Sequence, residues 1–210
     1  MRIAIIGGSR GTGLAVAHEA LARGHEVVIV SRSDPRLIRD DVRWLGGDAR
    51  DTTVLDRALE GCSATVTALG VTQTWQNTNL FSQAQVALSR AMDNAGLKRT
   101  VLITGLGAGD SRGHQGWLYD NVLFPVFLAR SYADKDRAET FLQKSDLDWT
   151  IVRPGRLTDG PKKNKVEALL TPETYRYGSI SRADVAAFVL GCIEKGTYLR
   201  QTPQIVDRKS

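Results

Sequence analysis

The feature that most constrains the fold is a glycine-rich turn between a short apolar run and a helical pattern. Residues 7–13 read Gly-Gly-Ser-Arg-Gly-Thr-Gly; they follow the apolar run 3–6 and precede an apolar-periodic stretch that begins at Leu14. A strand, turn and helix in this order direct unpaired backbone N–H groups and the positive end of a helix dipole at one place, which suits a pyrophosphate. The sequence therefore predicts a dinucleotide-binding turn, with a turn that binds nothing as the alternative.

The glycines of this turn have separate expected roles, by analogy with the dinucleotide-binding fingerprint. Gly7 allows the tight turn, Gly11 lets the backbone approach the phosphates, and Gly13 lets the helix pack against the strand. The pattern is not a nucleotide-triphosphate P-loop, because Leu14 stands where that loop needs a lysine. The predicted cofactor contacts in this turn also include Ser9, Arg10 and Thr12.

Length and composition favour one globular domain spanning residues 1–210. The chain is 42% hydrophobic and 24% charged, with no internal repeat or low-complexity tract. Its apolar segments are too short for export or membrane spanning, so we expect a cytoplasmic protein without a membrane partner. The net charge is +5, but the basic residues are spread along the chain, and we expect no nucleic-acid partner.

Strand and helix patterns alternate along the chain, which is typical of a parallel sheet covered on both faces. We predict an α/β fold: a single doubly wound Rossmann domain with a central parallel sheet of about seven strands flanked by helices. Helical periodicity is clear over 80–95 and in the segment that Ser181 opens. The predicted strands are residues 2–6, 26–30, 42–46, 64–69, 99–104, 148–153 and 203–207.

Ligands of such sheets bind beyond the carboxyl ends of the strands. The turns after the predicted strands are therefore the candidate site. Two of them, 105–117 and 154–165, are long and contain glycines, so we expect them to shape a substrate pocket, with plain connecting loops as the alternative. The turn after the fourth predicted strand adds Leu69 and Gly70 to the predicted cofactor contacts.

The end of the second predicted strand indicates which dinucleotide binds. It carries Ser31 and Arg32, whose hydroxyl and guanidinium suit the 2′-phosphate of NADP. Asp34 is the best argument for NAD, although it precedes a proline in the loop. After the third strand, Asp48 and Ala49 offer a contact to the adenine amino group, or else an Asx-type turn. We expect NADP(H).

Taken together, these motifs resemble the atypical short-chain dehydrogenase/reductase family, and most closely its NmrA-like and flavin-reductase-like branch. The likeness also covers the segments 47–51, 104–108, 149–155 and 180–186. The resemblance implies a Rossmann-type sheet and an NAD(P) cofactor. It further implies backbone contacts to nicotinamide from Pro154, Gly155 and Arg156, and a functional lysine on the helix before the sixth strand, which Lys135 matches.

Two departures from the family pattern concern catalysis. Main-line members use Tyr-x-x-x-Lys, whereas this chain has Tyr132-Ala133-Asp134-Lys135, one residue shorter. Helical separations of three and four share a face, so Tyr132 can still reach the pocket from a rotated direction. Thr104 is the nearest counterpart of the family's serine, and Arg156 stands near the place where flavin-reducing relatives carry a histidine. The catalytic candidates are Lys135, Tyr132 and Thr104.

Other side chains give weaker signals. Among the histidines only His114 is placed for catalysis, with Trp117 and Tyr119 nearby, and Trp75 is a candidate pocket residue. No group of residues has metal-ligand spacing, so no metal is predicted. Asp184 and Ser181 are read as a helix-capping pair.

The sequence predicts an NADPH-dependent oxidoreductase that transfers a hydride to a small or planar acceptor such as a flavin, quinone or carbonyl. A protein that binds NADP and responds to it without turnover is one alternative, which the missing Tyr-x-x-x-Lys spacing favours. A sugar epimerase or dehydratase is another, since it uses the same kind of cofactor. The expected partner is a small-molecule acceptor, and the chain is expected to be a monomer or homodimer.

Overall fold

The computed structural model describes residues 1–37, 40–71, 78–113 and 128–208. Its centre is an eight-stranded sheet in the order β3-β2-β1-β4-β5-β6-β10-β8. Every pairing in it is parallel except that of β8 with β10. The strands are β1 Arg2–Ile6, β2 Glu26–Ser31, β3 Val42–Gly46, β4 Ala64–Thr67, β5 Arg99–Ile103, β6 Asp148–Pro154, β8 Val166–Leu169 and β10 Gln204–Asp207.

This order confirms the predicted doubly wound fold. The antiparallel edge strand β8 was not among the seven strands that the sequence predicted. A second small sheet, β7 Arg156–Thr158 paired with β9 Ser179–Ser181, was also not foreseen, and β7 lies within the expected loop 154–165. These strands are only three or four residues long, and their pairing partners decide their structure more than their own composition does.

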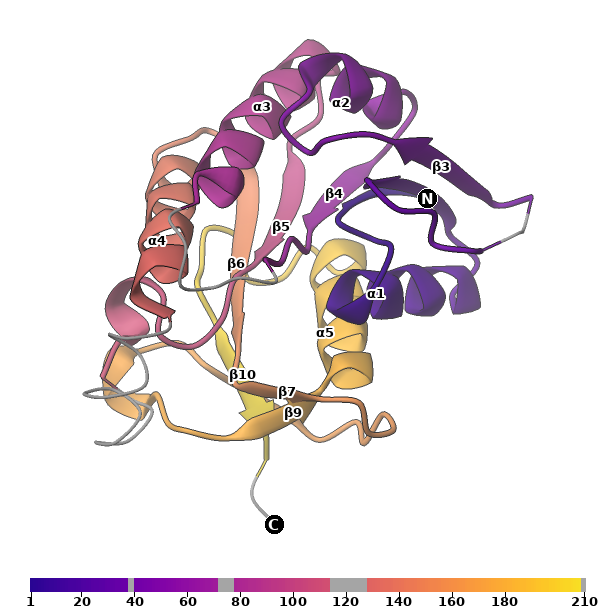
Figure 1. Ribbon diagram of the computed structural model, residues 1–210. Coiled ribbons are helices and arrows are strands. Elements are labelled where there is room, and N and C mark those ends of the chain that lie inside the picture. The colour runs from indigo at the N-terminus through magenta and orange to yellow at the C-terminus, as the bar shows by residue number, and fades with distance from the viewer. Residues whose placement is uncertain (38–39, 72–77, 114–127, 209–210) are drawn as a thin grey trace.

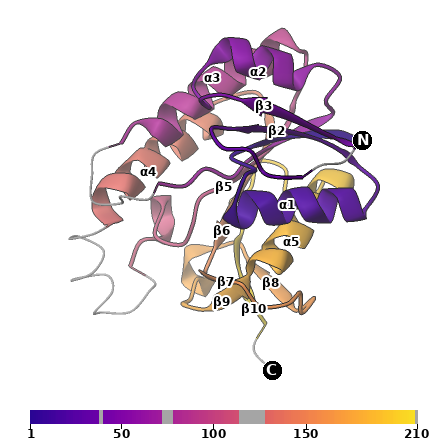
Figure 2. The ribbon, with the colours of Figure 1, turned by 45° about the vertical axis from the view of Figure 1, so that its right-hand side comes forward.

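In the described part of the chain, the helices α1 to α5 cover the two faces of the sheet (Figure 1). The first face carries α1 Gly11–Ala22 and α5 Arg182–Glu194, which lie side by side (Figure 2). The other face carries α2 Thr52–Leu59, α3 Leu80–Asn94 and α4 Ala129–Gln143. Side chains alternate along β1: Ile3 and Ile5 pack under α1 and α5, whereas Ala4 and Ile6 pack toward the other three helices.

Side-chain caps fix the starts of several helices. The hydroxyl of Ser181 accepts a hydrogen bond from the backbone N–H of Asp184 at 3.0 Å and donates to its carboxylate at 2.7 Å, which confirms the predicted capping pair. The start of α3 is capped from another helix: the fully buried carboxylate of Asp134 on α4 accepts from the backbone N–H of Phe81 at 2.8 Å. This contact ties the beginning of α4 to the beginning of α3.

The strand order reverses between β1 and β4, whose following turns meet at the carboxyl edge of the sheet. This is the place where open α/β sheets bind ligands. His114, Trp117, Tyr119 and Trp75 lie outside the described residues. No helix in the described part of the chain is both long enough and apolar enough to cross a membrane.

Candidate functional site

The glycine turn after β1 is closely packed against its neighbours. Gly7 has φ +94°, and a Cβ there would lie 2.6 Å from the carbonyl oxygen of Ala68 in the turn after β4. A Cβ on Gly13 would lie 2.2 Å from the carbonyl oxygen of Gly7. Neither position accepts a larger residue. The turn after β4 also brings Leu69 beside Gly7, while Gly70 is exposed with open space where a Cβ would lie.

The start of α1 fits a pyrophosphate. Its N-cap residue, Arg10, is exposed and makes no side-chain capping hydrogen bond, and the first turn contains no acidic residue. The positive end of the helix is therefore not neutralised by a side chain, and exposed Gly11 leaves its backbone accessible. Ser9 and Thr12 are partly buried in the same turn. The predicted residues of the glycine turn thus form one place suited to a bound anion.

The turn after β2 uses some of its polar groups internally. The hydroxyl of Ser31 donates to the carbonyl oxygen of Ser33 at 2.7 Å and accepts from the indole N–H of Trp44 at 3.1 Å. The Ser31 hydroxyl therefore uses its hydrogen for a bond within the turn. The carboxylate of Asp34 accepts a hydrogen bond from the backbone N–H of Arg36 at 2.7 Å, as in an Asx turn, and Asp34 is exposed.

Positive charge gathers beside the turn after β3. Two hydrogen bonds from the guanidinium of Arg50, at 2.7 and 2.8 Å, hold Asp48. These bonds lower the pKa of Asp48 to about 2, and the charge of Arg32 acts in the same direction. Asp48 is thus an ion-pair partner whose lone pairs are partly used, and Ala49 is buried beside it. Exposed Arg32 is the group at this end that remains suited to a phosphate.

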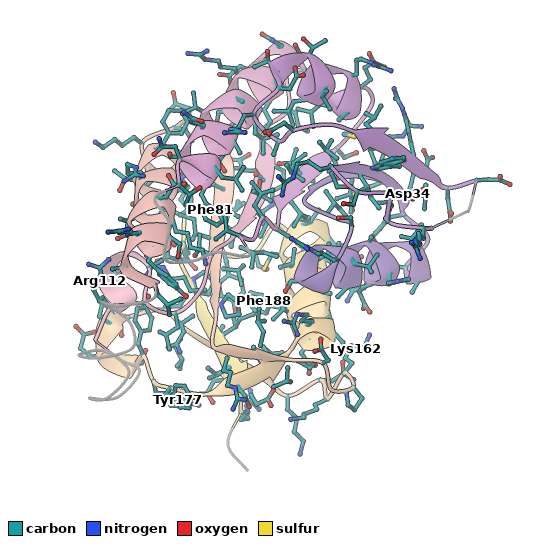
Figure 3. All side chains as sticks on the ribbon, in the orientation of Figure 1. Asp34, Phe81, Arg112, Lys162, Tyr177 and Phe188 are labelled. Atoms are coloured by element: carbon teal, nitrogen blue, oxygen red, sulfur yellow. The ribbon has the colours of Figure 1, made fainter. Side chains whose placement is uncertain are left out.

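A cavity of about 440 Å³ opens at the same carboxyl edge of the sheet, between the turns after β5 and β6 and the start of α4. All three catalytic candidates line it. Tyr177, which projects near the lower edge of Figure 3 and is 51% exposed, lies at this cavity as well. The lining residues are Thr104, Gly105, Leu106, Tyr132, Lys135, Pro154, Gly155, Arg156, Leu157 and Tyr177.

Lys135 lies at the centre of this arrangement. Its ammonium donates to the carbonyl oxygen of Thr104 at 3.0 Å and lies over the ring of Tyr132, 4.4 Å from the ring centroid. The ring of Phe81 lies 5.4 Å from the same ammonium. Burial lowers the pKa of Lys135 to about 8, against the opposing charges of Glu139 and Asp136. The shortened Tyr-x-x-Lys spacing therefore places the lysine on the ring face of the tyrosine.

A buried ion-pair network supports the cavity wall. The hydroxyl of Thr104 donates to Glu139 at 2.6 Å, and the other oxygen of this carboxylate accepts from Arg153 at 2.6 Å. Arg153 also pairs with Asp110. Burial opposes the charge of Arg153, but Glu139 and Asp110 together raise its pKa above the usual value. Because the Thr104 hydroxyl uses its one hydrogen to bond Glu139, it is not available to donate to a ligand. Its role here is to hold the end of the strand in position.

The segment from Pro154 to Arg156 has already used its backbone donors. The N–H of Gly155 donates to Ile205 at 3.0 Å, and the N–H of Arg156 donates to Gly178 at 2.8 Å. The carbonyl oxygen of Pro154 accepts from Leu106 at 3.0 Å. The N–H groups of Gly155 and Arg156 are therefore not free to contact a carboxamide. The side chain of Arg156 is exposed at the cavity.

Sequence reasoning missed two residues near the site. Tyr177 lines the cavity from a segment without a recognisable motif. Arg182 was noted only as part of the segment 180–186, yet its Nε lies 3.8 Å from the position of a Cβ on Gly11. The helical pattern that begins after Ser181 was the available signal for Arg182, because first-turn residues of α/β helices lie at the carboxyl edge of the sheet. The described residues contain no cluster that could hold a metal ion.

A sequence profile of proteins described as NAD(P)H-binding matches residues 7–196, from the glycine turn to just past the end of α5. The chain belongs to the NAD(P)H-binding family. This membership confirms the expected nicotinamide cofactor. It also agrees with the expected resemblance to an atypical short-chain dehydrogenase/reductase-like family, whereas the subtype itself stays a prediction.

Three proteins illustrate what this NAD(P)H-binding chain is similar to. ChuY, an anaerobillin reductase from Escherichia coli O157:H7, is 26% identical with a TM-score of 0.81, over 100% of this chain and 98% of ChuY. The uncharacterized sugar epimerase YhfK of Bacillus subtilis is 36% identical over 50% of this chain, and the match spans only 44% of YhfK. A Veillonella parvula short-chain dehydrogenase/reductase solved in complex with NADP is 15% identical with a TM-score of 0.80, over 98% of this chain and 94% of that chain, which shows the fold alone. The comparisons support an NAD(P)H-dependent enzyme.

Proposed function

We propose that the protein is an NADPH-dependent reductase that transfers a hydride to a small, planar acceptor carrying negative charge, such as an acidic flavin, quinone or conjugated carbonyl. The observation that carries this proposal is the cavity at the carboxyl edge of the sheet, between the turns after β5 and β6. It is lined by the cations Lys135 and Arg156, and none of its described lining residues is a carboxylate. Such a cavity attracts anions and disfavours cationic ligands.

The aromatic and apolar side chains of the lining favour a flat acceptor. Two tyrosines, Tyr132 and Tyr177, and the apolar side chains of Pro154 and Leu157 provide aromatic and apolar surface. Ligand sites combine such apolar walls with a few polar groups that fix orientation. Here the polar groups are Lys135 and Arg156, and a planar acceptor can lie against the rings while its acidic group pairs with a cation.

Bound NADPH supplies the hydride, and the residues of this chain supply binding and orientation. Lys135 offers an ammonium at the cavity, held in place by Thr104, to orient a ribose hydroxyl or the acceptor. Tyr132 is the second donor in reach of the cavity, since its hydroxyl lies 3.0 Å from the position of a Cβ on Gly105. A planar acceptor can take its proton from bulk water afterwards, so the reaction does not depend on a strong protein acid.

The choice of NADP over NAD is part of the proposal. Arg32 is exposed at the end of β2, and Arg10 is exposed at the start of α1. Asp34, the best argument for NAD, is engaged with the backbone of its own loop. Cations without a free carboxylate at this place favour a 2′-phosphate.

An epimerase is the second candidate, and the 36% identity to the sugar epimerase YhfK over half of the chain favours it. An epimerase returns its cofactor to the starting redox state in each turnover and therefore consumes no NADPH. Cofactor consumption thus separates the two functions. A protein that binds NADPH without turnover gives no consumption and no product with either class of substrate.

The proposal is tested by measuring acceptor-dependent oxidation of NADPH with a flavin, a quinone and neutral and anionic carbonyl compounds. We expect turnover with planar anionic acceptors. The Arg156→Gln variant should raise KM for an anionic acceptor by about tenfold, the loss of one charge-assisted contact, and leave KM for a neutral analogue nearly unchanged. Lys144→Gln, which removes a charge at the opposite end of α4, is the matched control. Equal effects of Arg156→Gln on both acceptors would contradict an anion-binding role.

A further inference from the structure

Arg182 brings a positive charge to the glycine turn from a distant part of the chain. It is the first residue of α5, and its Nε lies 3.8 Å from the position of a Cβ on Gly11, the first residue of α1. Its side chain is 28% exposed. The guanidinium therefore lies beside the place where the uncapped start of α1 offers backbone N–H groups to an anion.

The backbone that carries Arg182 is firmly held. Ser181 caps α5 through Asp184, and the carboxylate of Asp184 also accepts the backbone N–H groups of Lys163 and Asn164, at 2.8–3.1 Å. At the far ends of the two helices, Arg23 binds Glu194 at 2.7 Å, which fixes α5 against α1. The position of Arg182 relative to the glycine turn is thus set by the packing of α1 against α5.

The partner of Arg182 in this structure is weak. Its Nη1 lies 2.5 Å from a carboxylate oxygen of Asp159, whose side chain is 90% exposed. An ion pair with so exposed a carboxylate contributes little to the stability of the fold. A phosphate at the helix start would offer Arg182 a stronger, charge-assisted and bidentate partner.

We infer that Arg182 is a pyrophosphate-binding residue, which exchanges its ion pair with Asp159 for the dinucleotide phosphates when the cofactor binds. This inference rests on the cofactor of the proposed function but not on its acceptor or on turnover. The pyrophosphate is common to NADP and NAD, so Arg182 contributes equally to both. Arg32, in contrast, acts on the 2′-phosphate alone. Asp159 acts as a competing anion.

Calorimetric titration of the parent protein and three variants with NADP and with NAD tests this assignment. Arg182→Gln should weaken both cofactors by the same factor, about tenfold or more, the value of a hydrogen bond to a charged group. Asp159→Asn should tighten both, by up to about fivefold, because it removes the competitor. Arg32→Gln should weaken NADP only.

The two changes at the ion pair separate a binding role from a structural one. Both Arg182→Gln and Asp159→Asn break the same ion pair, so a purely structural role predicts weaker binding in both. Opposite signs support the inference, and equal signs overturn it. A loss confined to NADP in Arg182→Gln would also overturn it, because the contact would then be to the 2′-phosphate. A parent protein that binds NADPH tightly but reduces no acceptor would contradict the proposed function and leave the titration result intact.

Discussion

The ammonium of Lys135 donates a hydrogen bond to the carbonyl oxygen of Thr104 across 3.0 Å. This bond joins the middle of α4 to the end of β5 and holds the lysine at the cavity, above the ring of Tyr132. The ammonium is partly buried, and burial disfavours its charged form. A group maintained at such a cost is a candidate for function, because buried charges without a role are destabilising.

The first prediction concerns the pH dependence of turnover. The pKa of Lys135 is lowered to about 8, so the lysine is charged below pH 8 and loses its proton above it. If the charged form binds and orients the substrates, kcat/KM should fall as the pH rises through about 8, since this constant reports the free enzyme. Lys135→Arg should keep its activity to higher pH, because arginine stays protonated. Identical profiles for parent and variant would assign the titration to another group.

A second prediction concerns stability in the absence of cofactor. The unfolded chain keeps the proton of Lys135 up to about pH 10.4, whereas the native state loses it near 8, so unfolding takes up a proton in this window and stability rises with pH there. Below pH 8 the full cost of the buried charge is present. Lys135→Met should therefore be more stable than the parent at pH 7, by about 1–2 kcal/mol. This advantage should shrink between pH 8 and about 10.4. Urea denaturation at several pH values measures it, and a destabilised variant at pH 7 would contradict the account.

The third prediction is that Arg32 selects the phosphorylated cofactor. Arg32→Ala should reduce the preference for NADP over NAD by about 1–3 kcal/mol, the value of charge-assisted hydrogen bonds. Arg36→Ala, a charge loss at another exposed position of the same loop, is the control and should keep the preference. Fluorescence titration with both cofactors gives the ratio. An Arg32 variant that retains the parent's selectivity would rule out this reading of the β2 turn.

The fourth prediction concerns the buried network behind Thr104. Among the described residues, Glu139→Ala leaves the buried guanidinium of Arg153 with Asp110 as its one remaining ion-pair partner, and it removes the acceptor of the Thr104 hydroxyl. We expect a loss of about 3–5 kcal/mol in the free energy of unfolding. Glu26→Ala removes a comparable but exposed ion pair with Arg2 and should leave the free energy of unfolding nearly unchanged. Chemical denaturation gives the free energy of unfolding of both variants. Similar losses in the two would show that burial does not determine how much the Glu139 ion pair contributes to stability.

Much of the fold could be predicted because local signals agreed with it. The strands β1 to β6 and β10, the turn after β1 and the Ser181–Asp184 cap each have a signal within a few neighbouring residues. The edge strand β8 could not be found in this way. Its four residues, Val166–Leu169, form a strand because they pair antiparallel with β10. A strand that short carries little periodicity of its own.

The candidate site was predictable where a motif spans adjacent residues and unpredictable where packing creates it. The shortened spacing of Tyr132 and Lys135 was visible, but the placement of the ammonium on the ring face was not. Glu139 and Arg153 come from a helix and a strand, and nothing in their spacing predicts that they pair. The closeness of Arg182 to Gly11 depends on how α5 packs against α1.

Hydride transfer from NADPH to a planar acceptor can be followed in a single-turnover reaction. The reaction uses NADPH deuterated at one or the other position of nicotinamide C4 and is started with a planar anionic acceptor. We expect rapid, acceptor-dependent oxidation of NADPH that is slowed by deuterium at only one of the two positions, because a nicotinamide ring bound at the carboxyl edge would present one face to the cavity. Tight binding of NADPH with no oxidation by any acceptor in the panel would contradict it.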